Sequence, residues 1–402
     1  MSTVLWLMLV GCTPTSSSFF TENELFTIEQ MQRSNSSLDE SNQWDGNDAA
    51  IAFGQKLFFS HSLSPNAIAC STCHTPNIGF SDGLQQSFGA DVTDRHSPTL
   101  FDVAYQSWFR WDGGCDSLWC QAIGPLEASN EMNGSRTFVV SALNEDPDLK
   151  EDYQRIFGPL PEITSVDLTA RPTSESSPEN DLWMDLDEDQ QHDITETMVN
   201  VTKSIAAFES TIQSGTTPFD DFVDAFLDET ILEEDALAML TPEEEVGLRL
   251  FVGEGRCHLC HNGPTLSNDS FHNIGLGTRE WLADTDIGRY DGITMLQSSE
   301  FNSIGSWSDA PNGERAQRVD RLVQSTEQLG QYKTPTLRNL FQTAPYMHGG
   351  HFDTLDDVLE HYSGLEESTF QGHSDETLKP LNWTTREKEA VIAFLRLLDD
   401  SL

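Results

Sequence analysis

Basic residues are scarce in this sequence. It holds 22 lysine and arginine residues against 66 aspartate and glutamate residues, which gives a formal net charge of −44 over 402 residues. The acids are spread along the whole chain, so they surround the protein with a negative potential that repels nucleic acid and anionic lipid headgroups. Such a surface favours a basic partner protein, although a merely well-solvated surface would have the same composition. We therefore expect no nucleic-acid partner.

Long apolar runs are also missing. No apolar run long enough to cross a bilayer follows the N-terminus. Residues 4–10 (VLWLMLV) are a short apolar segment, and residues 9–12 (LVGC) resemble the lipobox of bacterial lipoproteins, whose cysteine is lipidated. We predict a signal and lipobox over residues 1–12, export to the periplasm, a lipid on Cys12 as the membrane anchor, and a polar tether over residues 13–43. An ordinary cleaved signal peptide or a lone cysteine is the alternative.

Two segments share the pattern Cys-x-x-Cys-His: residues 70–74 (CSTCH) and residues 257–261 (CHLCH). Attachment of a c-type haem requires this order, because two thiols one helical turn apart bond to the two vinyl groups on one porphyrin edge and the adjacent histidine ligates the iron. Zinc or redox CxxC sites are the rivals, and a histidine directly after both motifs argues against them. We predict two covalently bound haem c groups, attached to Cys70 and Cys73 and to Cys257 and Cys260, with His74 and His261 as iron ligands.

Three of the seven cysteines lie outside these motifs. Cys12 belongs to the lipobox, which leaves Cys115 and Cys120. An oxidising compartment favours a disulfide between these two, whereas two reduced thiols in a core are the alternative. Because a five-residue separation is poor disulfide geometry inside a regular helix, we expect the pair to bracket the start of a helix.

Helices with clear start signals surround the two haem motifs. Residues 241–244 (TPEE) supply an N-cap, a proline at the first helical position and a capping-box glutamate ahead of the second motif. Residues 49–59 precede the first motif in the same way. A closing helix follows Thr384, with apolar residues at helical spacing from Val391 to Leu398. Helix, haem motif, long loop and terminal helix make a small haem domain, and the chain contains this unit twice.

The arrangement of these units predicts a mainly α-helical fold with two c-type cytochrome-like haem domains in tandem and long loops. We expect the N-terminal haem domain over residues 44–228 and the C-terminal haem domain over residues 229–402. Residues 172–192 are rich in acids, serine and proline, so they predict a structureless acidic insertion in the first domain.

Four further patches, taken with the haem motifs, resemble the bacterial di-haem cytochrome c peroxidase/MauG family. The patches are residues 97–113 (from SPTL to WDG), 121–132 (QAIGPLEASNEM), 203–209 (KSIAAFE) and 334–349 (TPTLRNLFQTAPYMHG). With the motifs, they span most of the chain in a specific order. The resemblance implies a cytochrome-c-peroxidase-type oxidoreductase. In such an enzyme the first haem is the site of hydrogen peroxide, and the second haem passes on electrons from a small cytochrome or a copper protein (cupredoxin).

The resemblance also assigns catalytic residues. Trp111 matches a tryptophan between the two haems, and Gln121 and Glu131 match a glutamine and a glutamate of the peroxide pocket. Cleavage of the O–O bond requires a base that takes a proton from one oxygen and delivers it to the other. We expect Glu131 to move this proton and Gln121 to orient peroxide. Without the surrounding patches, Glu131 would be read as a solvated surface acid and Trp111 as a core residue.

Two departures from the family concern the first haem and a calcium ion. Some peroxidases of the family hold a histidine over the resting first haem, near the position of Phe88, but residues 81–94 contain no histidine. The first iron is therefore expected to be open to peroxide. Thr343 and Pro345 match positions that bind calcium between the domains, whereas His96 stands where the family often places an asparagine for this ion. The sequence leaves open whether calcium binds.

The sixth ligand of the second haem is a separate question. Residues 354–362 (TLDDVLEHY) predict a short capped helix with Tyr362 on its apolar face. The resemblance puts Tyr362 where electron-transfer haems of the peroxidases carry a methionine and MauG carries a tyrosine. A phenolate stabilises the higher oxidation states of iron, whereas a thioether favours the ferrous form. The candidates for this ligand are Met347, His348, His351, His361 and Tyr362. We favour Tyr362 over Met347, and a buried tyrosine beside the haem edge is the alternative.

Two other functions stay open at this point. A MauG-like enzyme would store two oxidising equivalents on its haems and oxidise tryptophan or tyrosine of a partner protein. Gly255 argues against a direct equivalent of MauG, because the resemblance places a substrate-facing tryptophan at this position. Gly114 also replaces an arginine that is common in the family. A non-catalytic di-haem electron carrier, with both irons six-coordinate, is the alternative from another class.

Overall fold

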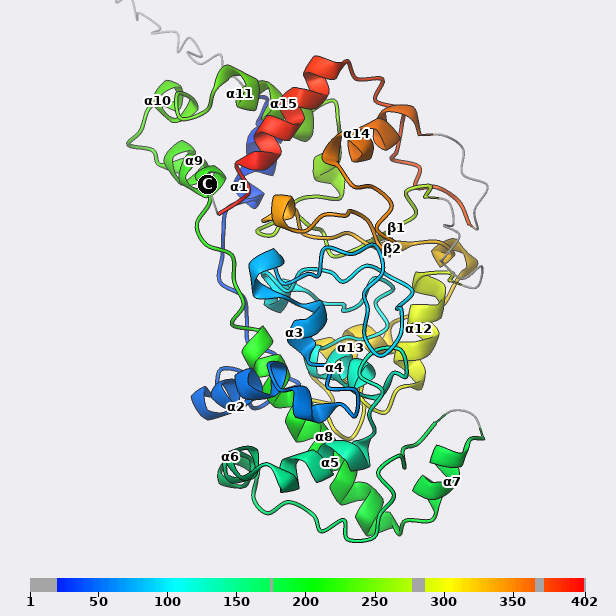
Figure 1. The fold of residues 1–402 in the computed structure, drawn as a ribbon. Coiled ribbons are helices and arrows are strands. Elements are labelled where there is room, and N and C mark those ends of the chain that lie inside the picture. The colour runs from blue at the N-terminus through cyan, green and yellow to red at the C-terminus, as the bar shows by residue number, and fades with distance from the viewer. Residues whose placement is uncertain (1–19, 174–175, 277–285, 366–371, 401–402) are drawn as a thin grey trace, which may run out of the picture.

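A computed structural model describes residues 20–173, 176–276, 286–365 and 372–400. Cys12 and the lipobox lie outside these residues. The described chain is mainly helical, with a two-stranded antiparallel sheet of β1 (Phe271–His272) and β2 (Tyr332–Lys333). Figure 1 shows one group of helices above this sheet and another below it. The predicted mainly α-helical fold with long loops is confirmed. None of the described helices is long and apolar enough to cross a bilayer.

The lower group of helices in Figure 1 carries the first haem motif. It contains α2 (Asp48–Phe58), α3 (Cys70–Cys73), α4 (Leu118–Glu127), α5 (Arg136–Glu145), α6 (Pro147–Phe157), α7 (Pro178–Met184) and α8 (Glu188–Glu209). Its core forms where α2 and α4 pack on the long helix α8. At the crossing of α2 and α8, a Cβ on Gly54 would lie 1.8 Å from the backbone oxygen of Ser204. The missing side chain of this glycine therefore allows the two backbones to touch.

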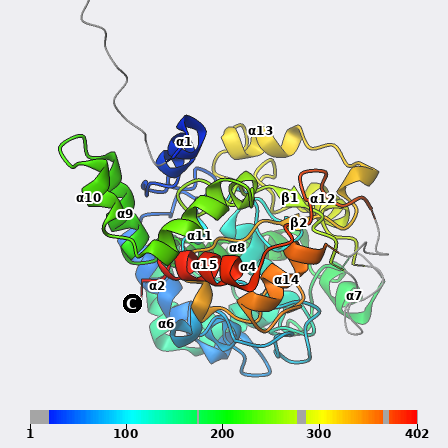
Figure 2. The ribbon, with the colours of Figure 1, turned by 90° about the horizontal axis from the view of Figure 1, so that it is seen from above.

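The upper group carries the second haem motif. It contains α1 (Glu22–Gln30), α9 (Pro218–Leu227), α10 (Glu233–Leu237), α11 (Pro242–Val252), α14 (Leu355–Gly364) and α15 (Thr385–Arg396). Figure 2 shows α11 beside α15, and a Cβ on Gly247 would lie 1.9 Å from the backbone oxygen of Ala390. In both domains, the helix ahead of the haem motif thus crosses the closing helix at a glycine.

The helix starts expected from the sequence are present. The Thr241 side chain caps α11 and Glu244 completes the capping box, while Thr384 and Glu387 do the same for α15. Helix α2 covers the residues predicted ahead of the first motif. These starts are local hydrogen-bond patterns, so the sequence is sufficient to predict them.

The expected polar tether is wrong for its described part, residues 20–43. Residues 22–30 form α1, and Ile28 and Met31 are fully buried in the core of the upper group, with Phe20 beside them. The Thr21 side chain accepts a hydrogen bond from the backbone of Glu24, which caps the helix. A few apolar residues at helical spacing are enough to anchor this segment, although its composition is polar.

The acidic stretch at residues 172–192 is not structureless where the structure describes it. It contains α7 and the first turn of α8. Trp183 is 5% exposed and packs in a small cluster with Val140 and Ile194. A single large aromatic side chain outweighs the polar composition here, because it buries much apolar area.

The chain also crosses between the two domains differently than expected. Helix α9 lies within the predicted N-terminal domain, but Phe219 and Phe222 are buried in the core of the upper group. Conversely, the segment of α12 (Arg289–Ser298) and α13 (Glu314–Asp320) lies beside the lower group, and Phe301 joins its core. The predicted boundary at residues 228 and 229 is therefore corrected. Long-range packing decides which core these helices join, and no local sequence pattern predicts it.

Candidate functional site

Both haem motifs open into one cavity of about 750 Å³ between the two domains. The first motif belongs to α3, and the second forms a short 3-10 turn after α11. The cavity is lined from one side by Cys70, Cys73 and His74 and from the other by Cys257, Cys260 and His261. The motifs lie 187 positions apart in the chain, and the fold brings them to a shared space.

The first histidine is held in the orientation that a metal ligand needs. Its Nδ1 lies 3.0 Å from the backbone oxygen of Phe80, and the backbone oxygen of Pro98 is also a hydrogen-bond partner of the ring. Because a carbonyl only accepts, Nδ1 donates to Phe80 and Nε2 keeps its lone pair for iron. Burial lowers the pKa of His74, which favours the neutral imidazole.

The second histidine repeats this arrangement. The Nδ1 atom of His261 lies 3.0 Å from the backbone oxygen of Leu266, and Pro335 takes the place that Pro98 has in the first site. Burial lowers the pKa of His261 to about 4. Residues 97–100 (SPTL) and 334–337 (TPTL) are therefore equivalent parts of the two domains.

The four motif thiols suit covalent attachment of haem. All four are free, and burial raises the pKa of each. Each site thus offers two thiols beside a neutral imidazole with a free Nε2, which is the donor set of a c-type haem. The residues fit the predicted cofactor at both places.

The three predicted catalytic residues line the same cavity. Gln121 lies on α4, and Glu131 follows in the turn after this helix, where its backbone N–H donates to the oxygen of Ala128 at 3.1 Å. Trp111 precedes α4. Burial raises the pKa of Glu131, while the nearby Arg110 guanidinium lowers it. A buried carboxyl group whose pKa is raised holds a proton more readily than a solvated one, which suits a group that takes up and delivers a proton.

Trp111 is 9% exposed and is held by both domains. Its Nε1–H donates to the backbone oxygen of His96 at 2.9 Å, and its own backbone oxygen accepts the N–H of Lys333 at 2.8 Å. The indole lies edge-on to His348, with 6.4 Å between the ring centroids, and His348 stacks on Tyr332 at 3.5 Å. The structure therefore places Trp111 between the two halves of the cavity.

Tyr362 and Met347 both line the cavity near the second motif. Helix α14 forms as predicted, with Leu355 and Leu359 buried, and burial raises the pKa of Tyr362 well above its usual range. His361 is engaged elsewhere, since its Nε2 lies 2.9 Å from the backbone oxygen of Ile274. The geometry thus brings Tyr362 to the second haem site, and Met347 stays an alternative ligand because it lines the same cavity.

Cys115 and Cys120 bracket the start of α4 as expected, with Ser117 as the N-cap. Both are buried, and both are thiols in the structure rather than a disulfide. The two side chains are hydrogen-bond partners, and burial raises the pKa of Cys120 well above its usual value. Thr343 and Pro345, the predicted calcium positions, lie at the cavity wall near His96.

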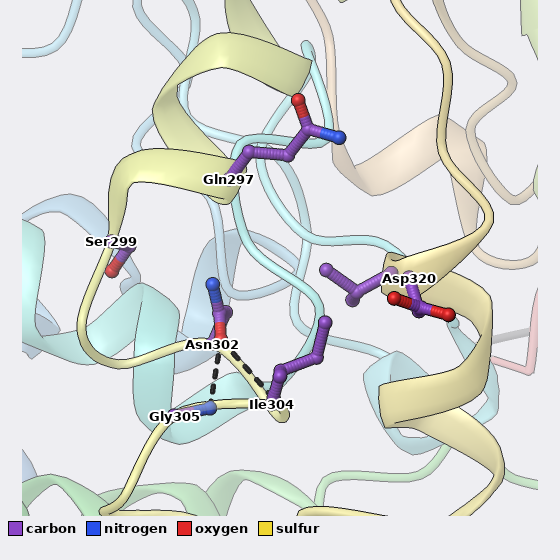
Figure 3. A pocket seen from close by; sticks show the side chains of 7 residues that line it. Gln297, Ser299, Asn302, Ile304, Gly305 and Asp320 are labelled. Carbon is purple, nitrogen blue, oxygen red and sulfur yellow. Dashed lines mark hydrogen bonds between the residues drawn. The ribbon is translucent and has the colours of Figure 1, made fainter.

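A second pocket, of about 420 Å³, lies at α12 and α13 and is shown in Figure 3. The Oδ1 atom of Asn302 accepts the N–H groups of Ile304 and Gly305 there, at 3.1 and 2.9 Å. Asp320 is the one acid or base among its lining residues. Among the described residues of its wall, Asp320 has no second acid or base as a partner, so this pocket supplies no acid–base pair.

Glu209 lines the main cavity and was not singled out from the sequence, although it ends the KSIAAFE patch. It is 4% exposed, and its Oε2 has no hydrogen-bond partner. Burial raises the pKa of Glu209 to about 8, and its charge in turn raises the pKa of Cys70. Arg110 was missed as well. No local sequence pattern marks an acid at the end of a helix as buried, so the burial of Glu209 is visible only in the three-dimensional structure.

Glu209 makes the stability of the protein depend on pH. Its pKa is raised from 4.5 on folding, so the folded state binds the proton more tightly than the unfolded chain. The contribution of Glu209 to stability is therefore greatest at low pH and is lost as the pH rises from about 4.5 to about 8. We expect Glu209→Gln to remove this loss, so the Tm of the variant should exceed that of the wild type increasingly across this range. Parallel thermal denaturation curves of the two holoproteins against pH would contradict this assignment.

Two attachment sites for c-type haem in one interdomain cavity define the chain as a di-haem c-type cytochrome. A family model described as di-haem cytochrome c peroxidase matches residues 48–226. The methylamine utilization protein MauG of Methylorubrum extorquens is 31% identical over 352 residues, covering 87% of this chain and 77% of that protein. The chain therefore belongs to the di-haem cytochrome c peroxidase family of oxidoreductases, which confirms the resemblance and implies two haem c groups.

Peroxidases are also among its relatives. The cytochrome c551 peroxidase of Pseudomonas aeruginosa is 26% identical over 312 residues, covering 76% of this chain and 69% of that protein. The solved structure of the diheme peroxidase BthA from Burkholderia thailandensis has the same fold, with a TM-score of 0.64 and 19% identity over 88% of this chain and 87% of that one. The relatives of this chain thus include proteins named MauG and proteins named peroxidases.

Proposed function

We propose that this protein is a periplasmic peroxidase that reduces hydrogen peroxide to two molecules of water with two electrons and two protons. The observation that carries this proposal is the position of Glu131 and Gln121 in the wall of the cavity that His74 enters. The position matched to a histidine over the first haem, Phe88, is 61% exposed. A proton-transfer group and an open approach to the first haem are what a peroxidase needs.

The chain's own residues move the proton. Bound haem supplies the iron that exchanges electrons with peroxide. The Glu131 carboxylate takes the proton from one peroxide oxygen and delivers it to the other, which leaves as water. The Gln121 amide donates a hydrogen bond that orients peroxide. The Arg110 guanidinium opposes the effect of burial on the pKa of Glu131 and so favours the carboxylate form of this group.

Trp111 is suited to pass electrons between the two haem sites without losing a proton. Its Nε1–H donates to the backbone oxygen of His96, and an amide oxygen is too weak a base to remove this proton. Its backbone oxygen accepts the N–H of Lys333 in the second domain and its indole donates to His96 in the first, so the ring stays fixed between them. A fixed relay with no proton to move lowers the reorganisation that each electron transfer requires.

The proposal includes a basic electron donor and a location outside the cytoplasm. A net charge of −44 attracts a cationic small cytochrome or cupredoxin by long-range electrostatics. This attraction is screened by salt, so the second-order rate of donor oxidation should fall with ionic strength. The lipobox at residues 9–12 supports attachment to a membrane through a lipid on Cys12.

A second candidate is oxidation of tryptophan or tyrosine in a partner protein, as the similarity to MauG suggests. Gly255 stands where a substrate-facing tryptophan was expected, but the ring of Trp383 packs against it. A Cβ on Gly255 would lie 2.6 Å from Cζ2 of Trp383. An aromatic side chain from another segment therefore covers this face of the second haem site. The position of Trp383 is the observation that supports oxidation of a partner protein as the second candidate function.

Two measurements on the purified holoprotein test the proposal. One equivalent of peroxide, mixed anaerobically with the resting protein in a stopped-flow instrument, should change the spectrum of the first haem. In steady state, two reduced cytochrome c molecules should be oxidised for each peroxide consumed. A protein with no high-spin ferric signal and no reaction with peroxide would be an electron carrier. Reaction with peroxide but no sustained oxidation of a small donor would favour the second candidate.

Tyr362 should set the potential of the second haem. Replacing Tyr362 by methionine exchanges a phenolate donor for a thioether, so we expect the midpoint potential of that haem to rise. Tyr346 is a matched control because it also lines the cavity and burial raises its pKa to about 12. Tyr346→Phe should leave the potential unchanged. Spectroelectrochemical titration of both variants checks this, and an unchanged potential and spectrum in Tyr362→Met would leave Met347 as the ligand.

A further inference from the structure

His96 is a junction between the two domains, and it is 4% exposed. Its backbone N–H donates to the oxygen of His348 at 3.0 Å, and its backbone oxygen accepts the indole N–H of Trp111. Its ring contacts two further carbonyls. Nδ1 lies 2.7 Å from the oxygen of Leu84, and the backbone oxygen of Thr343 is the other hydrogen-bond partner of the ring. One residue thus joins the loop around residue 84 to the segment at residues 343–348.

The ring of His96 does not fit a calcium site at this place. Calcium takes about 6–8 oxygen ligands, and imidazole is not among the donors it prefers. The carbonyl of Thr343, one of the two positions expected to bind the ion, faces an imidazole nitrogen instead. The nearby Asp82 carboxylate is a feature that would suit a cation, since its Oδ2 has no hydrogen-bond partner. Burial lowers the pKa of His96, so the ring is a neutral imidazole with one N–H, which Nδ1 donates to the Leu84 oxygen.

We propose that the His96 imidazole replaces a calcium ion between the two haem domains, and that His96 is a positioning residue for Trp111. The ring lies against the Leu84 and Thr343 carbonyls that an ion would otherwise gather, and its Nδ1–H donates to the Leu84 oxygen. The backbone of the same residue holds the indole of Trp111 through its oxygen. The link between the domains is therefore part of the covalent chain, and a chelator cannot remove it.

The wild-type holoprotein provides the first test. After equilibration with calcium and dialysis into calcium-free buffer, it should contain far less than one calcium ion per chain by mass spectrometry of the metals. Addition of EGTA should change neither its Tm nor the rate at which electrons equilibrate between the two haems. Release of one calcium ion per chain, with a lower Tm in EGTA, would overturn the proposal. This measurement needs no variant, so it decides the question even if substitutions at residue 96 fail to fold.

The second test is a gain of function. Asparagine is shorter than histidine and offers an amide oxygen, so His96→Asn should open the site and supply a calcium ligand. We expect the Tm and the interhaem electron-transfer rate of this variant to be lower than in the wild type without calcium, and to recover when calcium is added. A variant that matches the wild type in both, with and without calcium, would show that the ring holds nothing in place.

His61 supplies the matched control. Its Nδ1 also lies 2.8 Å from a backbone oxygen, that of Ala67, but the side chain is exposed and lies within one domain. His61→Asn should therefore gain no response to calcium and should leave the interhaem rate unchanged. A calcium-dependent Tm in this control would trace the response to added amide groups in general and would remove the argument for position 96.

Discussion

Replacing Glu131 by glutamine should lower kcat/KM for hydrogen peroxide by about 10²- to 10⁴-fold, because general acid–base catalysis contributes effects of this size. Glutamine keeps the shape of the side chain but cannot carry a proton between the two peroxide oxygens. The haem motifs lie on other segments, so both haems should stay attached. Steady-state turnover with a reduced cytochrome c measures the effect, and a pyridine haemochrome spectrum counts the haems.

Glu209→Gln is the matched control for this experiment. Glu209 is also a buried acid of the cavity wall with a raised pKa, but its charge acts on Cys70 at the attachment edge of the haem. Its substitution should leave turnover within a few-fold of the wild type. Glu131 and Glu209 are thus distinguished by position rather than by chemistry. Full activity in Glu131→Gln would remove the assignment of Glu131 as the proton carrier, whatever the control shows.

The parts of the site that could be predicted from sequence are those fixed by local chemistry. Cys70, Cys73 and His74 must be adjacent to hold a haem, so their pattern is visible without a structure. Glu131 is different, since it is one of 66 acids and only the patch around it distinguishes it. For Glu209, no neighbouring residue in the sequence is required by the same chemistry. The burial of Glu209 results from the packing of α2 and α4 on α8, which no spacing in the sequence reports.

The fold shows the same division between local and long-range determinants. The capped starts of α11 and α15 follow from side chains within one helical turn, and they were predicted correctly. The placement of α1 and α9 in the second domain depends on buried residues such as Ile28 and Phe219 meeting a core that forms far along the chain. A short amphipathic segment does not indicate which of two similar cores will cover its apolar face.

The largest expected loss of stability comes from replacing Arg338, a residue of the TPTLRN patch, by methionine. Arg338 is 1% exposed, and its two terminal nitrogens donate to the Asp220 carboxylate at 3.0 and 2.8 Å. Methionine fills similar space but leaves Asp220 with a buried charge, which costs about 3–5 kcal/mol in comparable cases. Arg33 lies 3.8 Å from the same carboxylate and offsets part of this cost, so we expect about 3 kcal/mol.

The effect should be concentrated in the second haem domain. The Nε of Arg338 also donates to the backbone oxygen of Pro264 at 2.6 Å, in the loop that leads to Leu266, the partner of His261. Loss of this contact frees the loop that orients the second iron ligand. Guanidinium unfolding of the holoprotein, followed at the absorbance of the second haem, should therefore show an earlier transition than unfolding followed at the first.

Arg249→Met is the control for the loss of a positive charge. Arg249 is partly exposed and pairs with Glu245 on the same helix at 3.1 Å, an arrangement worth about 0.3–0.5 kcal/mol. If both variants shift unfolding equally, the buried pair with Asp220 is not what stabilises the domain. Adding Asp220→Asn to Arg338→Met should recover part of the loss, because the asparagine carries no charge that burial penalises and its amide oxygen can still accept the hydrogen bonds of Thr217.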